Sequence, residues 1–103
     1  MYKIIYLPVA RQDIENIILY ISGQLKAPKA AFNLLDEFEC SFSLLREFPY
    51  ADKLYRPVRT LEEEYRMLPV KNYAVFYVVR EQEKTVEIHR VIYARRNLTK
   101  LLK

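Results

Sequence analysis

Basic and tyrosine side chains are interleaved through the second half of the chain, and both types can act on a phosphate group. The basic residues of this set are Arg56, Arg59, Arg66, Lys71, Arg80, Arg90, Arg95, Arg96, Lys100 and Lys103, and the tyrosines are Tyr50, Tyr55, Tyr65, Tyr73, Tyr77 and Tyr93. Arginine binds phosphate through paired hydrogen bonds, and tyrosine can stack on an unpaired base. A metal-free ribonuclease could use these side chains for acid–base catalysis and for stabilising a pentacoordinate phosphate. Alternatively, most of them are solvated strand ends and half-buried core tyrosines.

The charge of the chain is unevenly distributed. Residues 1–51 carry five Lys/Arg and six Asp/Glu, whereas residues 52–103 carry twelve and seven. The second half therefore has a net charge of +5 within a total of +4. This asymmetry favours a polyanionic partner, either nucleic acid or an acidic protein.

Other kinds of chemistry have little support in the sequence. With one histidine and one cysteine, far apart, we expect no metal site, and the single glycine excludes a glycine-rich phosphate loop. We therefore expect no cofactor. His89 is either a structural or partly solvated histidine, or a general base or phosphate contact. The acidic run at 62–64 is interpreted as a solvated loop.

The sequence also indicates where the protein works. Cys40 has no second cysteine to pair with, which favours a reducing compartment. The N-terminal apolar run stops at Pro8, too early for a signal peptide, and no run approaches the roughly 18 apolar residues of a membrane span. We expect a cytoplasmic protein made of one domain, residues 1–103.

The hydrophobic pattern predicts one strand and two helices in the first half. The β-branched and aromatic run from about Tyr2 to Leu7 is typical of a strand. Apolar residues at helical spacing follow it, namely Ile14, Ile17, Ile18, Ile21 and Leu25, and again Ala31, Leu34, Leu35, Phe38, Phe42 and Leu45. Pro8 and Pro28 suit the first turns of the two helices, and Gly23 is expected to loosen or end the first. A short link predicts an antiparallel helix hairpin.

The second half has the two-residue period of strands. Residues 64–70, 73–79 and 85–93 are predicted strands, with Lys71-Asn72 as a tight link in which Asn72 tolerates a positive φ. Both faces of 73–79 are apolar, so this strand is expected at the centre of the sheet. The register of 85–93 stays open: Arg90 interrupts an apolar face, through either a bulge or half exposure. Leu98, Leu101 and Leu102 predict a short C-terminal helix.

The fold class is therefore α+β: an N-terminal strand, an antiparallel helix hairpin and a three-strand antiparallel meander (β-α-α-β-β-β), with a short C-terminal helix. With this order of elements, the sequence of residues 65–102 resembles that of the toxins of the RelE/ParE superfamily of type II toxin–antitoxin systems. The similarity rests on residues 72–78 and on Val86, Ile88, Arg90, Val91, Arg95, Arg96, Leu101 and Leu102. The N-terminal strand and first helix are also similar, so the resemblance covers essentially the whole chain.

The resemblance implies a growth-inhibiting toxin that a cognate antitoxin neutralises. ParE-like members inhibit DNA gyrase, and RelE-like members cleave mRNA on the ribosome; a third possibility is a member that only binds its antitoxin. RelE-like nucleases usually carry an arginine on the central strand, where this chain has Ala74, and this favours the ParE-like alternative slightly. If the chain is RelE-like, the expected catalytic residues are Arg66, Arg90, Tyr93 and Arg95. The expected nucleic-acid or target-binding residues are Arg56, Arg59, Lys71, Arg96 and Lys100.

Overall fold

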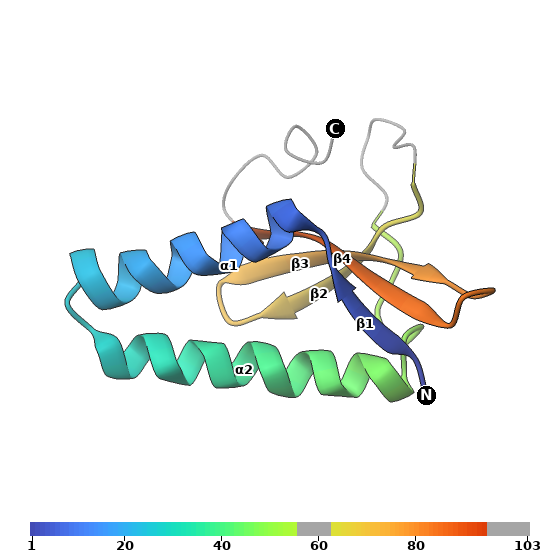
Figure 1. Ribbon diagram of the computed structural model, residues 1–103, viewed down its shortest axis with the longest axis horizontal. Coiled ribbons are helices and arrows are strands. Elements are labelled where there is room, and N and C mark those ends of the chain that lie inside the picture. The colour runs from blue at the N-terminus through green and yellow to red at the C-terminus, as the bar shows by residue number, and fades with distance from the viewer. Residues whose placement is uncertain (56–62, 95–103) are drawn as a thin grey trace.

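The structure is a computed structural model that describes residues 1–55 and 63–94. The elements in these ranges are β1 Lys3–Tyr6, α1 Pro8–Leu19, the π-helical turn η1 Tyr20–Gln24, α2 Pro28–Glu47, β2 Arg66–Val70, β3 Tyr73–Arg80 and β4 Thr85–Tyr93. The predicted α+β order is confirmed (Figure 1). The predicted C-terminal helix falls on residues outside the described ranges.

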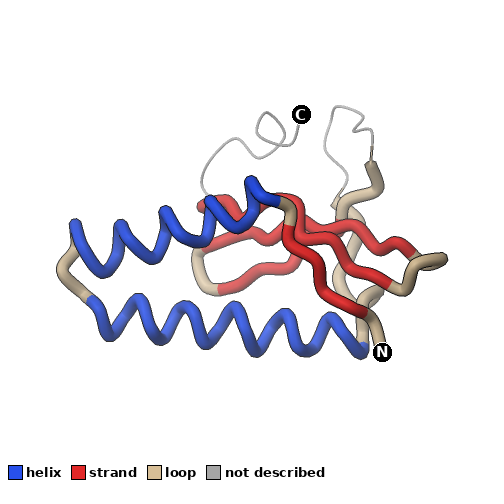
Figure 2. Tube along the Cα trace, in the orientation of Figure 1, coloured by secondary structure: helices blue, strands red, loops and turns tan. Residues whose placement is uncertain are grey.

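The two helices run antiparallel and lie together against one face of the sheet (Figure 2). Each begins with its proline, Pro8 or Pro28, where the missing N–H has no helical partner to lose. The apolar stripes turn toward the sheet, and they bury Ala10, Ala31, Leu34, Phe38, Phe42 and Leu45. None of the helices in the described ranges is both long and apolar enough to cross a bilayer.

The hairpin link reverses at a lysine rather than at the glycine. Gly23 lies within η1, where the α-helical hydrogen-bond pattern loosens as expected. Lys26 then adopts the left-handed conformation, with φ of 52°. The N–H of Ala27 donates across it to the carbonyl of Ile21 at 3.0 Å, which closes the helix end as glycine commonly does.

The sheet has the order β1-β4-β3-β2. The last three strands form the predicted antiparallel meander, and β1 returns to pair in parallel with β4. The tight link between β2 and β3 is Lys71-Asn72, but the positive φ of 54° belongs to Lys71. The assignment of that conformation to Asn72 was therefore wrong, because the turn needs it at its first position.

A bulge in β4 explains the irregular pattern of that strand. Phe76 of β3 is opposite Arg90, whereas the adjacent Tyr77 is opposite Ile88, so His89 is the extra residue. The bulge exchanges the two faces, because each strand residue points opposite to its neighbour. Before it, Ile88 faces the helices; after it, Val91 does. Of the two possibilities that the sequence left open, the bulge is the one observed.

The sheet buries apolar side chains on both faces. The larger core lies between the sheet and the helix hairpin, and it includes Phe38, Phe42, Val75, Tyr77, Val86, Ile88 and Val91. On the opposite face a second cluster consists of Tyr65, Ala74, Phe76, Val78 and Ile92. β3 contributes to both, as expected for an inner strand.

Candidate functional site

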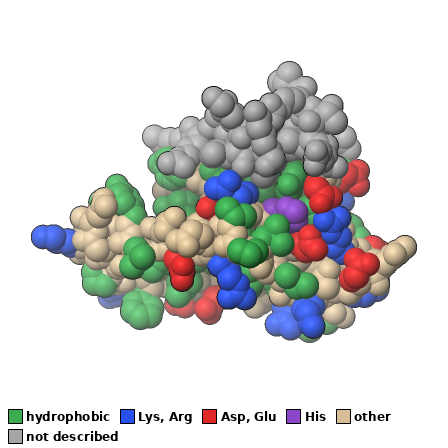
Figure 3. Space-filling model, turned by 45° about the horizontal axis from the view of Figure 1, so that its top comes forward, with side chains coloured by type: hydrophobic (Ala, Val, Ile, Leu, Met, Phe, Trp, Pro, Cys, Tyr) green, Lys and Arg blue, Asp and Glu red, His purple; other side chains and the backbone are tan. Residues whose placement is uncertain are grey.

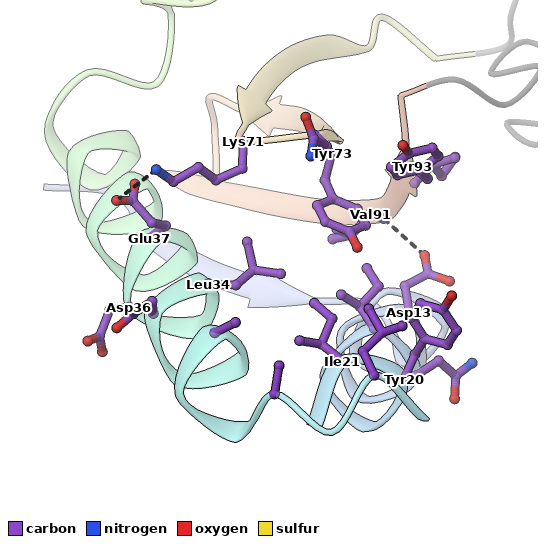
Figure 4. A pocket seen from close by; sticks show the side chains of 18 of the residues that line it. Asp13, Tyr20, Ile21, Leu34, Asp36, Glu37, Lys71, Tyr73, Val91 and Tyr93 are labelled. Carbon is purple, nitrogen blue, oxygen red and sulfur yellow. Dashed lines mark hydrogen bonds and ion pairs between the residues drawn. The ribbon is translucent and has the colours of Figure 1, made fainter. Parts of the chain in front are cut away.

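A groove of about 1360 Å³ lies between the helix hairpin and the C-terminal end of β4. In Figure 4 the helices form one side of the groove and the strand ends the other. The apolar part of its lining includes Ile17, Tyr20, Ile21, Leu34, Tyr73 and Val91. This volume exceeds the roughly 300–1000 Å³ that is typical of small-molecule pockets. The groove therefore suits a polypeptide segment better than a small ligand.

Tyrosine rings line the sheet side and the mouth of the groove. The Tyr73 and Tyr93 ring centroids are 5.7 Å apart at 70°, an edge-to-face contact. Burial raises the pKa of Tyr73, so its hydroxyl is protonated at neutral pH and serves as a donor rather than a base. Tyr20 of η1 is half exposed at the same site. These rings provide stacking and hydrogen-bonding contacts for a bound chain.

Asp13 of α1, which lines the groove, links this helix to β4. Its Oδ2 accepts hydrogen bonds from Arg90 Nε at 2.8 Å and from the Val91 backbone N–H at 2.9 Å, and its Oδ1 accepts from Arg90 Nη2 at 3.1 Å. The three groups come together here because β1 stops at Tyr6, where Pro8 turns the chain into α1. The Asp13 carboxylate thus accepts the β4 backbone hydrogen bond that a longer β1 would otherwise accept.

The charged residues around the groove nearly balance. Asp13 pairs with Arg90, and at the rim Lys71 Nζ lies 3.7 Å from Glu37 Oε1. Asp36 adds one further acid to the lining. Among the described lining residues the net charge is therefore about −1 at neutral pH. Such a lining does not attract a polyanion.

The predicted catalytic residues that the structure describes do not converge. Arg66 Nη1 donates to the Asp52 carbonyl at 2.7 Å, and its guanidinium lies 5.0 Å from the centre of the Tyr50 ring. Arg90, which binds Asp13 on α1, and Tyr93 both line the groove, so Arg66 is the one described candidate that lies outside it. Lys71 is also at the groove, whereas Arg56, Arg59, Arg95, Arg96 and Lys100 lie outside the described residues.

His89 takes part in a charged network on the opposite face of the sheet. Its Nε2 is 3.1 Å from Glu87 Oε1, and its Nδ1 is 3.4 Å from the Tyr65 hydroxyl. Arg80 links Glu87, at 3.2 Å, to Glu63, at 2.6 Å. Figure 3 shows acidic, basic and histidine side chains gathered on this side. Alternation along β4 predicts that Glu87 and His89 share one face. No pattern in the sequence predicted the contact of His89 with Tyr65 or that of Arg80 with Glu63.

Arg80→Gln should weaken the fold modestly and reduce its sensitivity to acid. The hydrogen bonds from Arg80 lower the pKa of Glu63; burial raises the pKa of Glu87, but bonds from His89 and Arg80 outweigh it and lower that pKa overall. Lowered carboxyl pKa values stabilise the fold above about pH 4.3, and this stabilisation is lost as the pH falls through the folded values. Because these groups are one-third exposed, we expect a loss of about 0.5–1 kcal/mol at pH 7.

Urea denaturation of the wild type and of Arg80→Gln at pH 7 and pH 3 measures both effects. The gap between the two proteins should narrow at pH 3, where the carboxyl groups become protonated. A constant gap would mean that Arg80 acts through packing and not through these ion pairs. Lys53→Gln changes an exposed cation outside this network and serves as the control.

A separate hydrogen-bonded cluster around Glu81 links the N-terminal segment to the β3–β4 turn. The Tyr2 hydroxyl donates to Glu81 at 2.6 Å, and Lys84 and Tyr50 bind the same carboxylate. Hydrogen bonds from Lys84, Tyr2 and Tyr50 lower the pKa of Glu81 to about 2, and the bond to Glu81 raises the pKa of Tyr50 to about 12. This exposed cluster holds chain segments together, and it adjoins Arg66 through the Tyr50 ring.

The described residues contain no group of three or more His, Cys, Asp or Glu side chains that could hold a metal ion. The groove, with its aromatic mouth and near-neutral lining, is the site that these residues define best. A comparison with curated proteins found no match.

Solved structures share the fold, and among them are the following three. A chain of the chromosomal ParDE toxin–antitoxin system from P. aeruginosa matches with a TM-score of 0.72 at 16% identity, over 92% of this chain and 98% of that one. The RelBE2 toxin–antitoxin complex from Mycobacterium tuberculosis matches at 0.58 and 22%, over 89% and 96%. A metal-bound toxin from Helicobacter pylori matches at 0.57 and 22%, over 90% and 94%. These likenesses show that the fold is shared.

The family is shown by the sequence model that fits this chain. The model of the ParE toxin of the type II toxin–antitoxin system parDE matches residues 4–98. The chain belongs to this family, within the RelE/ParE superfamily that its sequence resembles. It is therefore a toxin of a type II toxin–antitoxin system.

Proposed function

We propose that this toxin inhibits DNA gyrase by binding and without nuclease chemistry, and that a cognate antitoxin neutralises it in the cytoplasm. The observation that carries the proposal is that Arg66 is held by Asp52 outside the groove that Arg90 and Tyr93 line. A metal-free nuclease needs its acid, base and cation within reach of one phosphate. Here Arg66 and Arg90 are held by different elements.

The sheet face opposite the helices supports the same conclusion. At the central-strand position where RelE-like relatives usually carry arginine, Ala74 is 2% exposed and lies among Tyr65, Phe76 and Ile92. An apolar cluster offers a phosphate neither charge nor hydrogen bonds. This face thus supports packing rather than phosphate binding at its centre.

The antitoxin is proposed to occupy the groove. Its apolar lining and size suit a polypeptide segment, and its near-neutral charge disfavours nucleic acid. A solved relative, the RelBE2 system, is a toxin–antitoxin complex. The basic residues Arg56, Arg59, Arg95, Arg96 and Lys100 are then proposed to contact the target, while the groove holds the antitoxin.

A two-target assay tests the proposed activity. The purified toxin is expected to inhibit supercoiling of relaxed plasmid by gyrase, to leave ribosome-bound mRNA intact, and to lose its effect when the antitoxin is added. The double variant Arg95→Ala/Arg96→Ala should inhibit more weakly while remaining folded by circular dichroism. Cuts at codon positions with normal supercoiling would refute gyrase as the target.

An mRNA endonuclease is the second candidate, and the setting of His89 favours it. A carboxylate lies 3.1 Å from Nε2 and a tyrosine hydroxyl 3.4 Å from Nδ1, so the imidazole would take a proton through the Tyr65 hydroxyl and not at a free nitrogen. If this candidate holds, His89→Gln should abolish cleavage of mRNA on the ribosome. His89→Gln should instead leave gyrase inhibition unchanged if the first proposal holds.

A further inference from the structure

The free end of the helix hairpin carries large apolar side chains that face solvent. We call this end the hairpin tip, and it comprises the exposed side chains of Leu19, Tyr20, Leu25, Lys26, Lys29 and Phe32. The exposed fractions of the four apolar members range from 50% for Tyr20 to 70% for Phe32. Figures 1 and 2 show the tip reaching past the sheet, and Figure 3 shows hydrophobic side chains gathered around it. Exposed apolar side chains that gather in one place are typical of an interaction surface.

The π-helical turn η1 brings one of these side chains to the surface. The spacing of Leu25 from Ile14 and Ile21 predicts that it continues the apolar stripe of α1 toward the sheet. In η1 the N–H of Leu25 donates to the carbonyl of Tyr20, five residues back, at 3.0 Å. This wider turn rotates Leu25 away from the stripe, and it is 55% exposed. Single π-helical turns inside helices are frequent at functional sites.

The charge of the tip has one sign. No Asp or Glu occurs from residue 16 to residue 35, and the charged side chains of this stretch are Lys26 and Lys29. Both are exposed, and neither forms an ion pair within residues 1–55 and 63–94. A surface complementary to the tip is therefore apolar at its centre and acidic at its rim.

We propose that the hairpin tip inserts into an apolar pocket with an acidic rim on the protein that the toxin inhibits. The proposal deepens the proposed function and rests on it for the identity of that protein, which is gyrase. It adds a second contact to the one proposed for the basic residues. Because the tip projects beyond the sheet, it fits a concave partner surface better than a flat one (Figure 1).

Other occupants fit the tip less well. Two lysines are fewer than the four to eight basic residues typical of segments that bind anionic lipids, and exposed apolar rings and chains do not attract a polyanion. A symmetric contact between two tips would bring like charges together. The antitoxin is proposed to lie in the groove, and Leu19 and Phe32 are not part of its lining.

Two double variants of the full-length toxin test the apolar and the charged part of the tip. Leu19→Ser/Phe32→Ser removes apolar contacts, and Lys26→Glu/Lys29→Glu reverses the charge. Each should need at least about tenfold more toxin for half-inhibition of gyrase supercoiling, because anchoring side chains carry most of the affinity of an interface. Both should remain folded by circular dichroism, since the replaced side chains are exposed. Their affinity for the antitoxin, measured by calorimetry, should stay within about threefold of the wild-type value.

Matched controls lie at the other end of the molecule. Leu44 is 61% exposed on the same helix as Phe32, twelve residues further along, which is about 18 Å. Leu44→Ser therefore removes a similar side chain away from the tip. Lys3→Glu/Lys53→Glu changes the net charge by the same amount as the charged tip variant. Both controls should inhibit supercoiling within about threefold of the wild type.

Each other outcome has a separate meaning. Tip variants that inhibit gyrase as well as the wild type does overturn the tip contact and leave the proposed function standing. A wild-type toxin that does not inhibit gyrase overturns the proposed function and this contact with it. Weaker antitoxin binding with unchanged gyrase inhibition would assign the tip to the antitoxin instead. Sedimentation with vesicles of phosphatidylcholine and phosphatidylglycerol that the tip variants lose, again with unchanged gyrase inhibition, would assign it to a lipid surface.

Discussion

Phe38→Ala is expected to lower the free energy of unfolding by about 3–5 kcal/mol, the usual cost of emptying a buried phenylalanine site. Phe38 is 1% exposed. Its ring stacks on Phe42 at 6.0 Å and meets the edge of Tyr73 at 6.1 Å, so it joins α2 to the sheet beside the groove. Since small domains are stable by only about 5–15 kcal/mol, most of the stability would be lost.

Urea denaturation followed by circular dichroism measures this change. Phe32→Ala is a matched control, because Phe32 lies on the same helix but is 70% exposed. The control should change the stability by no more than about 0.5 kcal/mol. Similar losses for the two variants would show that the burial of Phe38 between α2 and the sheet does not set the cost.

Asp13→Ala is expected to cost about 2–3 kcal/mol, because charge-assisted bonds are the stronger ones and their partners lose an acceptor. The side chains of Asp13 and Arg90 are 13% and 25% exposed, so water replaces the lost bonds only in part. The loss should also weaken antitoxin binding, because Asp13 and Val91 line the groove that is proposed to hold the antitoxin.

Two variants show which property of Asp13 matters. Asp13→Asn keeps an oxygen for the Val91 N–H but removes the charge, and we expect it to cost about 1 kcal/mol. Asp36 lines the same groove, and its exposed carboxylate forms no ion pair within the described residues. Asp36→Ala should therefore leave the free energy of unfolding almost unchanged. If Asp13→Ala were as mild as Asp36→Ala, the carboxylate would not be what holds β4 to α1.

The element order was predictable because hydrophobic period is a local property. The stripe at steps of three and four predicts the helix hairpin, and the two-residue alternation predicts the strands, as observed. The family resemblance was visible for the same reason, since it depends on short runs such as residues 72–78. Arg90, by contrast, matched the family pattern but gave no sign of its contact with Asp13.

That contact joins residues 77 apart in the sequence, and no local rule links them. Likewise, a one-residue bulge decides which side chains of β4 face the helices, although its neighbours alternate regularly. In the link between β2 and β3 the positive φ belongs to Lys71, because the pairing of the two strands sets the turn type and residue preference alone does not.

The sequence by itself determined the α+β class, the helix hairpin, the meander and the toxin family, since each follows from local periods and short motifs. Only the tertiary structure decided where the chain offers a site. β1 pairs with β4 only as far as Ile88, and the groove lies beyond that point, between the helices and the end of β4. That point depends on the parallel register of two strands distant in sequence, which no local pattern of residues specifies.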